Sequence, residues 1–357
     1  MTSELIEFDR RRRASAGRWE ESSYVPEPPA TLNDREANGT RLSIRRIVAP
    51  FDGSATAECT VPYVAALARA FSAQVTLLRV LEQPEGAAGP PVDALDWEMA
   101  RAEALAALTR LQNTLEAEGC SAGIEIVQGR SAEQIVHFTV RDSADLIVLS
   151  SHGAGGLHRW NLAGTVYKVV ATTHSSVLIV PATRFAGAEA QVVFRRMLVP
   201  LDCSARAECI LPAATELAKA HGAQLILAHV VPEPEMPRRL PPSNEDLELV
   251  QKLVERNERE ARAYLREVQA RLAASSGPVE VRLSVSPRRT QALRDMAKQE
   301  EVDLIVLCAH GSTGDPSQRY GEVTSQLLQE SEVPVIILQD LAQPLSMPAA
   351  GPERRGP

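Results

Sequence analysis

Residues 50–59 read PFDGSATAEC, and residues 200–209 repeat this stretch as PLDCSARAEC. A second phrase also recurs, as ADLIVLSSHG at 144–153 and as VDLIVLCAHG at 302–311. Two phrases that recur in the same order indicate a tandem duplication of one domain. The offset is 150 residues for the first phrase and 158 for the second, so the second copy holds a longer segment between its phrases.

The chain divides into two copies with short additions. We expect domains at 42–182 and 194–340, a linker at 183–193, and tails at 1–41 and 341–357. The tails are polar, rich in proline or arginine, and show no apolar period. Such segments bury too little apolar surface to fold, so we expect both tails to be disordered.

The composition restricts the class of protein. With 44% hydrophobic and 24% charged residues in a chain of 357, we expect a soluble globular protein. The net charge of −8 argues against a general nucleic-acid-binding surface. No stretch approaches the ~18 consecutive apolar residues of a membrane span, and the N-terminus lacks an apolar secretory core. We therefore expect a cytoplasmic protein. The five cysteines show no CxxC spacing, so we expect reduced thiols and no metal site.

The first copy alternates predicted strands and helices. Apolar, β-branched runs predict strands at 44–49, 74–80, 123–128, 146–149 and 177–180, with helices between them. The runs are continuous, as in LIVL and VLIV, which is typical of parallel strands covered on both faces. The second copy follows the same course. The sequence thus predicts an α/β fold of two tandem, doubly wound, parallel five-stranded sheets of Rossmann-like type.

The second copy differs in its long helix, predicted at 244–274. Seven apolar residues mark one stripe along this helix, with charged residues elsewhere. They are Leu247, Val250, Val254, Ala261, Leu265, Val268 and Leu272.

Both repeated phrases lie where strands end. Asp52 follows the first strand of the first copy, and residues 150–156 follow the fourth. In a doubly wound sheet these two strands are neighbours, and ligands bind beyond their carboxyl ends. We therefore expect both phrases to meet in one crevice.

The second loop is suited to phosphate. Gly153, Gly155 and Gly156 permit backbone angles that turn successive N–H groups toward one anion. Gly164 and Thr165 then begin a helix, whose N-terminus carries a partial positive charge. A glycine-rich loop alone is a weak signal. The nearby Asp52 loop and the helix start at Thr165 strengthen it.

These residues resemble the universal stress protein family, over both copies. Its nucleotide-binding members carry a glycine, two residues, a glycine, nine residues, and then Gly-Ser or Gly-Thr, with an aspartate after the first strand. The resemblance implies ATP as ligand, with or without Mg²⁺. The residues that it implies are Pro50, Phe51, Asp52 and Val80 beside adenine and ribose, Leu149, Ser150 and His152 beside ribose, and Gly153, Gly156, Gly164, Thr165 and Val166 at the phosphates.

The chain departs from this pattern in both copies. Ser150 replaces the first glycine of the first copy, and ten residues rather than nine separate Gly153 from Gly164. In the second copy Cys308 replaces the first glycine, and Glu322 replaces the Ser/Thr. We expect the Glu322 carboxylate to occupy the N–H donors of the helix start and to repel phosphate. The second copy is therefore predicted not to bind ATP.

The preferred hypothesis is a nucleotide-dependent regulatory protein of the stress response, not an enzyme. We expect an adenine nucleotide in the first copy, an unknown protein partner and a homodimer. The resemblance implies that the copies pair through their last strands, 177–180 and 335–338.

The alternatives are a scaffold that binds no nucleotide, a slow ATPase, a nucleotidyl transferase and a flavin carrier. PFDGS lacks the histidine that a transferase motif needs. His152 and His310 recur, which favours a role in shaping the loops over catalysis.

Overall fold

The structure is a computed structural model that describes residues 44–82, 94–151, 164–182, 191–234, 243–312 and 318–340. The predicted tails and most of the predicted linker lie outside these residues. The domain boundaries therefore remain a prediction.

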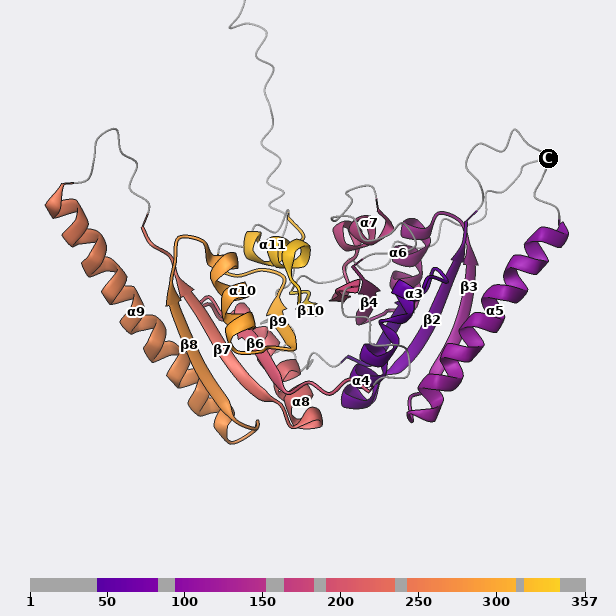
Figure 1. The fold of residues 1–357 in the computed structure, drawn as a ribbon, viewed down its shortest axis with the longest axis horizontal. Helices are drawn as coiled ribbons and strands as arrows, with labels where there is room; N and C mark the ends of the chain where they lie inside the picture. Colours follow the sequence, from indigo (N-terminus) through magenta and orange to yellow (C-terminus); the bar gives the residue numbers. More distant parts are fainter. Residues whose placement is uncertain are drawn as a thin grey trace, which may run out of the picture.

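The first copy contains the predicted alternation of strands and helices (Figure 1). Its strands are β1 (Arg46–Pro50), β2 (Gln74–Leu81), β3 (Ala122–Gln128), β4 (Leu146–Ser150) and β5 (Ser176–Val180). Its helices are α3 (Ala55–Glu58), α4 (Val61–Phe71), α5 (Ala94–Ala117), α6 (Ser131–Arg141) and α7 (Thr165–Thr172).

The second copy repeats this course. Its strands are β6 (Arg196–Pro200), β7 (Gln224–Val231), β8 (Val279–Val285), β9 (Leu304–Cys308) and β10 (Val335–Leu338). Its helices are η2 (Ala207–Ile210), α8 (Leu211–His221), α9 (Asn244–Ala273), α10 (Arg289–Gln299) and α11 (Glu322–Glu330).

Local sequence sets where several helices begin and end. Ser54 caps α3 by accepting a hydrogen bond from the Ala57 amide. A capping box of Ser243 and Asp246 begins α9. Gly222 ends α8 in the left-handed conformation, at φ +65°, where glycine carries no steric penalty.

The two five-stranded halves form one continuous sheet. Its strand order is β3-β2-β1-β4-β5-β10-β9-β6-β7-β8. Every pairing within a half is parallel, whereas β5 and β10 pair antiparallel, with Leu178 opposite Ile336. This confirms the predicted fold class within each copy and the predicted pairing of the last strands. Through this pairing the two predicted five-stranded sheets form one ten-stranded sheet.

Helices cover both faces of the sheet. One buried cluster joins the sheet to α4, α5, α8 and α9, and a second joins the opposite face to α6, α7, α10 and α11. Each cluster contains residues of both copies. The continuous apolar strands that the sequence shows are therefore explained by burial on both faces.

The stripe predicted on α9 is buried over only half its length. Ala261, Leu265, Val268 and Leu272 are buried, whereas Leu247 is 51% exposed. The N-terminal half of α9 extends past the edge of the sheet, so no strand lies beneath it (Figure 1). The predicted helical period is thus confirmed, and the structure adds that only its second half is buried.

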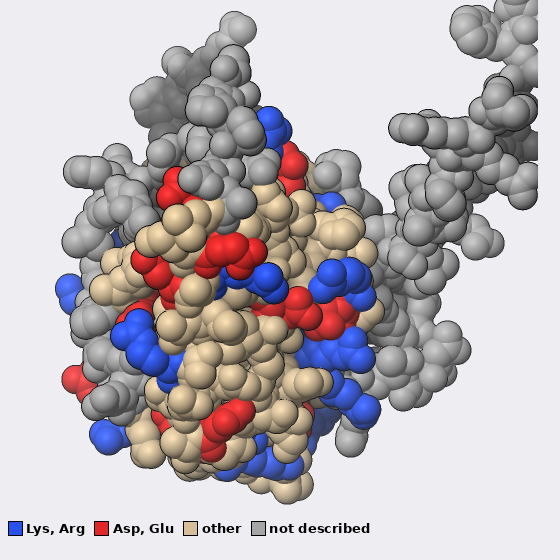
Figure 2. Space-filling view, turned by 90° about the vertical axis from the view of Figure 1, so that its right-hand side faces the viewer, with Lys and Arg blue, Asp and Glu red and all other residues tan. Residues whose placement is uncertain are grey.

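The charged side chains are mixed on the face at the first-copy end of the molecule. Figure 2 shows acidic and basic side chains interspersed there with uncharged ones, without a broad field of one sign. Among the described residues, no helix combines the length and the apolar composition that crossing a bilayer requires.

Phe194 packs between the copies on the face of α4 and α8. Its side chain is 1% exposed, and its ring centroid lies 6.2 Å from that of Tyr63 in α4. The His221 ring, at the end of α8, meets it edge-on at 4.9 Å. Because α4 belongs to the first copy and α8 to the second, this aromatic side chain joins the two halves beside the sheet.

We expect Phe194→Ala to lower the free energy of unfolding by about 3–5 kcal/mol, because it leaves a cavity where both copies meet. Urea unfolding followed by circular dichroism measures this change. Val193→Ala is the matched control: Val193 is 52% exposed, and its loss should cost less than about 0.5 kcal/mol. If both variants unfolded at the same urea concentration, Phe194 would not have the assigned role of joining the two copies.

Candidate functional site

The second copy contains a cavity of about 360 Å³ at the carboxyl ends of its strands. Its walls come from the ends of β6, β7 and β9 and from the starts of α10 and α11. The polar and ionisable residues that line it are Asp202, His229, Arg289, Cys308, His310, Ser312, Glu322 and Thr324. The two repeated phrases therefore meet in one crevice here, as predicted for a doubly wound sheet.

Asp202 connects the two loops of this cavity. One carboxylate oxygen accepts hydrogen bonds from the Ser204 amide at 3.1 Å and from its hydroxyl at 2.6 Å. The other accepts the Ser312 amide of the loop after β9. Burial alone raises the pKa of Asp202, but these hydrogen bonds outweigh it and hold the pKa below its ordinary value.

Gly311 is required by the position of this carboxylate. A Cβ atom at residue 311 would lie 2.1 Å from an oxygen of Asp202, which no side chain permits. The glycine of the second phrase thus lets the loop approach the aspartate of the first.

His310 holds the loop after β9 in place through two hydrogen bonds. Its Nδ1 donates to Asp340 at 2.6 Å, and its Nε2 donates to the carbonyl of Gln318 at 2.7 Å. A carbonyl and an ionised carboxylate can only accept, so these two contacts favour the form of the ring in which both nitrogens carry protons. Burial by itself lowers the pKa of His310, but Asp340 outweighs it and raises the pKa above its ordinary value. The structure thus supports the predicted loop-shaping role.

Glu322 differs in part from its prediction. It is the first residue of α11 and lines the cavity. However, its carboxylate accepts a hydrogen bond from the Gln326 side chain at 3.4 Å, and no side chain caps this helix start. Glu322 therefore places negative charge at the cavity without occupying the N–H donors. The same loop contains a second acidic residue, Asp315, followed by Pro316, and both lie outside the described residues.

The first copy places its corresponding residues at the same edge. Asp52 accepts hydrogen bonds from the Ser54 amide and hydroxyl, as Asp202 does from Ser204. The strand β1 that precedes Asp52 pairs directly with β4. Ser150, the last residue of β4, is buried and lies 3.9 Å from the sulfur of Cys59. The ends of these strands are therefore adjacent, as predicted.

The second part of the first-copy site is the start of α7. Gly164 is the N-cap of α7 and has no side-chain cap, and Thr165, its first helical residue, is exposed. His152, Gly153 and Gly156 lie outside the described residues, so their predicted phosphate contacts stay predictions.

The other predicted residues lie at the same edge of the sheet and are less exposed than Thr165. Pro50 ends β1, and Phe51 is buried, with its amide bonded to the Leu78 carbonyl. Three more lie at or beside the ends of elements and contribute apolar surface to the second core cluster: Val80, Leu149 and Val166.

Sequence reasoning missed Arg79. This half-buried side chain of β2 donates to the Phe51 carbonyl at 3.1 Å, and its guanidinium lies 3.5 Å from the Cβ position of Gly53. His229 occupies the same place in the second copy and bonds the Leu201 carbonyl at 2.7 Å. The sequence did contain a signal for this side chain, because Arg79 and His229 are basic residues at matching positions of the two copies.

No group of three or more His, Cys, Asp or Glu suited to hold a metal ion occurs among the described residues.

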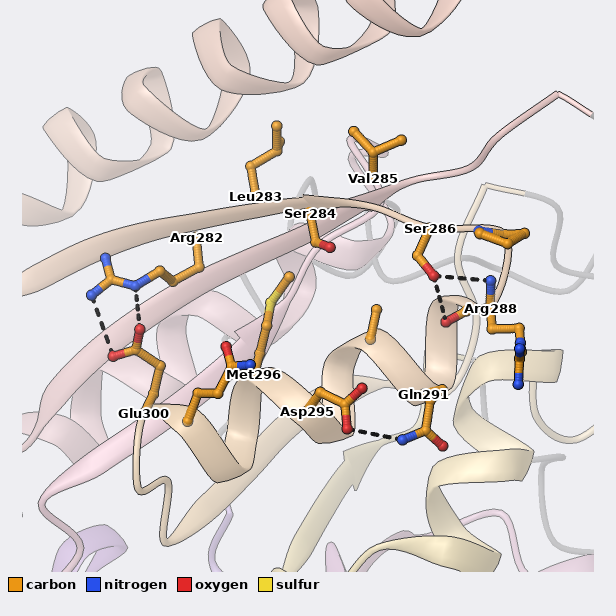
Figure 3. Close-up of a pocket in the computed structure, with 13 residues that line it drawn as sticks. Arg282, Leu283, Ser284, Val285, Ser286, Arg288, Gln291, Asp295, Met296 and Glu300 are labelled. Atoms are coloured by element: carbon orange, nitrogen blue, oxygen red, sulfur yellow. Dashed lines mark hydrogen bonds and ion pairs between the residues drawn. The ribbon is translucent and has the colours of Figure 1, made fainter.

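A second hollow, of about 580 Å³, lies between β8 and α10 (Figure 3). Several of its polar side chains already have partners: Arg282 pairs with Glu300 and with the nearby Glu280, and Gln291 donates to Asp295. It lies at the edge strand rather than at the carboxyl ends of the central strands. We therefore assign the candidate site to the crevice at the strand ends.

The His310–Asp340 pair predicts a pH-dependent stability. Because the folded-state pKa is raised, its contribution is full below the unfolded-state value of about 6.5 and is lost as pH rises through the folded value. We expect the wild-type chain to lose more stability between pH 6 and pH 8 than Asp340→Asn does. Urea unfolding at both pH values measures this, and an equal loss in both proteins would refute it.

Comparison with known proteins gives a consistent result. The sequence profile of the universal stress protein family matches residues 43–181 and 194–339. A universal stress protein of Methanocaldococcus jannaschii is 30% identical over 153 residues, which cover 42% of this chain and 88% of that protein.

Solved structures show the same fold. A universal stress protein of Archaeoglobus fulgidus has a TM-score of 0.61 at 18% identity, covering 84% of this chain and 98% of that one. A Pseudomonas aeruginosa structure described as a putative universal stress protein has a TM-score of 0.57 at 16% identity, covering 84% and 94%. With the family profile matching both halves, the chain belongs to the universal stress protein family.

Proposed function

We propose that this protein binds an adenine nucleotide, ATP, in its first copy and acts as a regulatory protein of the stress response. One observation supports this most: in the second copy, Asp202 and the first residue of α11 line the same cavity. The first copy has the same elements in the same order, with Thr165 where the second has Glu322. Its crevice therefore presents a hydroxyl where the second presents a carboxylate.

The residues of the first copy suit a nucleotide. The uncapped start of α7 offers N–H groups and a partial positive charge to phosphate oxygens, and Gly164 lets them come close. Arg79 adds a cation beside the Asp52 loop. Asp52 can accept hydrogen bonds from ribose hydroxyls, while Pro50 and Val80 offer apolar contact to adenine.

A magnesium ion would accompany the phosphates in this proposal. Because Mg²⁺ retains several waters and is bound through few protein ligands, phosphate oxygens would supply its main contacts. In this proposal the Thr165 hydroxyl and the Asp52 carboxylate would supply protein oxygen atoms to it.

Regulation would follow from a shift in population. The proposed nucleotide contacts two loops that come from different strands, so it favours the conformation in which both are closed around it. We also propose that a protein partner recognises this conformation. In the same proposal the chain forms a homodimer and is located in the cytoplasm.

Two alternatives remain. The additional residue before Gly164 and the serine at 150 favour a scaffold that binds no nucleotide. A slow ATPase would require a group that activates water, and turnover by the purified chain would reveal it.

The proposal is tested by calorimetry of the full chain with ATP, ADP and AMP. We expect wild-type binding and an affinity for ATP at least about tenfold weaker in Thr165→Ala, because a hydrogen bond to a charged group is lost. Thr172→Ala is the matched control, since Thr172 is exposed at the other end of the same helix. No heat from any nucleotide at millimolar concentration would favour the scaffold.

The second copy offers a gain-of-function test. We expect Glu322→Ser to create or strengthen nucleotide binding there, because it removes a carboxylate from the phosphate position. The measured stoichiometry should rise from one nucleotide per full chain toward two. Glu332→Ser, on the loop after α11, is the control that removes the same charge away from the cavity. An unchanged stoichiometry in Glu322→Ser would count against this explanation of the second copy.

A further inference from the structure

Two cysteines meet beneath the cavity of the second copy. The sulfur atoms of Cys209 in η2 and Cys308 at the end of β9 lie 2.9 Å apart. Both side chains are buried, at 7% and 5% exposure, and they form a small cluster of their own. They are 99 residues apart in the chain, so only the fold brings them together.

The first copy holds only one of the two thiols. Its corresponding pair is Cys59 and Ser150, whose sulfur and oxygen lie 3.9 Å apart. The same backbone positions thus carry a thiol and a hydroxyl in one copy, and two thiols in the other. The second copy therefore has two sulfur atoms in contact where the first copy has only one sulfur.

Small molecules have a path to this pair. Cys308 lines the 360 Å³ cavity, together with Ala207 of η2, two residues before Cys209. A hydroperoxide that enters the cavity would therefore reach Cys308 before it reaches Cys209.

We propose that Cys209 and Cys308 are a redox-active thiol pair that a hydroperoxide converts into a disulfide across the floor of the second-copy cavity. This inference does not rest on nucleotide binding. It assigns the second copy an oxidant-sensing site where the first copy has its candidate nucleotide site.

The chemistry balances with hydrogen peroxide as the oxidant. The Cys308 thiolate attacks one peroxide oxygen, the O–O bond breaks, and protonation of the other oxygen releases water and leaves a sulfenic acid. The Cys209 sulfur then attacks the Cys308 sulfur, the S–O bond breaks, and a second water leaves with the proton of Cys209. Two thiols are oxidised by two electrons, and one peroxide is reduced to two waters. A dithiol reductant reverses the step by thiol–disulfide exchange.

The link would join two walls of the cavity. One sulfur belongs to η2, which follows the Asp202 loop, and the other ends the strand before His310 and Gly311. Oxidation therefore fixes the two loops relative to each other, and reduction releases them.

Cys203 is the competing partner, six residues before Cys209. It is exposed on the loop, and its sulfur lies 3.8 Å from Nδ1 of His229. Partial burial and the neighbouring Asp202 raise the pKa of its thiol to about 11. The contact shown for its sulfur is with His229, whereas the sulfur atoms of Cys209 and Cys308 contact each other. We therefore expect the disulfide to join Cys209 to Cys308 rather than to Cys203.

The test is a thiol count on the full chain. Fully reduced protein is treated with stoichiometric hydrogen peroxide, quenched, denatured and titrated. We expect the five thiols of the reduced chain to fall to three, with a mass lower by two hydrogen atoms and one cross-linked peptide pair that joins 209 to 308. Dithiothreitol should restore all five thiols. Five thiols after peroxide, or a disulfide that maps to another pair, would overturn the proposal.

Matched variants identify the pair. Cys308→Ser reproduces the thiol and hydroxyl of the first copy, so it should fold and form no disulfide. Cys203→Ser should form the disulfide as the wild-type chain does. Circular dichroism establishes the fold of each variant, and the wild-type thiol count stands whether or not a variant folds. A disulfide in folded Cys308→Ser, or its loss in folded Cys203→Ser, would contradict the assignment.

Discussion

The antiparallel pairing of β5 with β10 is the constraint on which the rest of the structure depends. It joins two parallel half-sheets into one, so the last strand of each copy is buried between two neighbours. An unpaired strand at this place would expose backbone N–H and C=O groups along an apolar segment. The pairing also lets both core clusters run through both copies, with Phe194 filling the space between α4 and α8.

The two copies share one backbone plan, but their crevices have different chemistry. Asp52 and Asp202 hold equivalent serines, and Arg79 and His229 bond equivalent carbonyls. The differences fall at the crevice, where a threonine begins the helix in the first copy and a glutamate begins it in the second. Beneath the crevice, a serine or a cysteine faces the buried thiol. Asp340, which holds His310, has Ala182 at its place in the first copy. Duplication thus preserved the scaffold while the two sites diverged.

Most of the fold could be predicted, because parallel strands that helices cover on both faces have a recognisable sequence pattern. Runs such as LIVL are apolar at every position, and each became a buried central strand. The convergence of both phrases could also be predicted, because neighbouring parallel strands end at one edge. The contacts of Glu322 could not, since its choice between backbone donors and Gln326 depends on side-chain packing. The burial of α9 could not either, because it depends on where the sheet ends.

By itself the sequence determined the duplication, the α/β class, the order of the elements and the edge at which the candidate site lies. These follow from repeats and from local periodicity, which act over a few residues. Only the tertiary structure decided that His310 meets Asp340 and that Cys209 meets Cys308. Each of these joins residues distant in the chain, and such pairings are set by how the strands and helices pack, which no local pattern records.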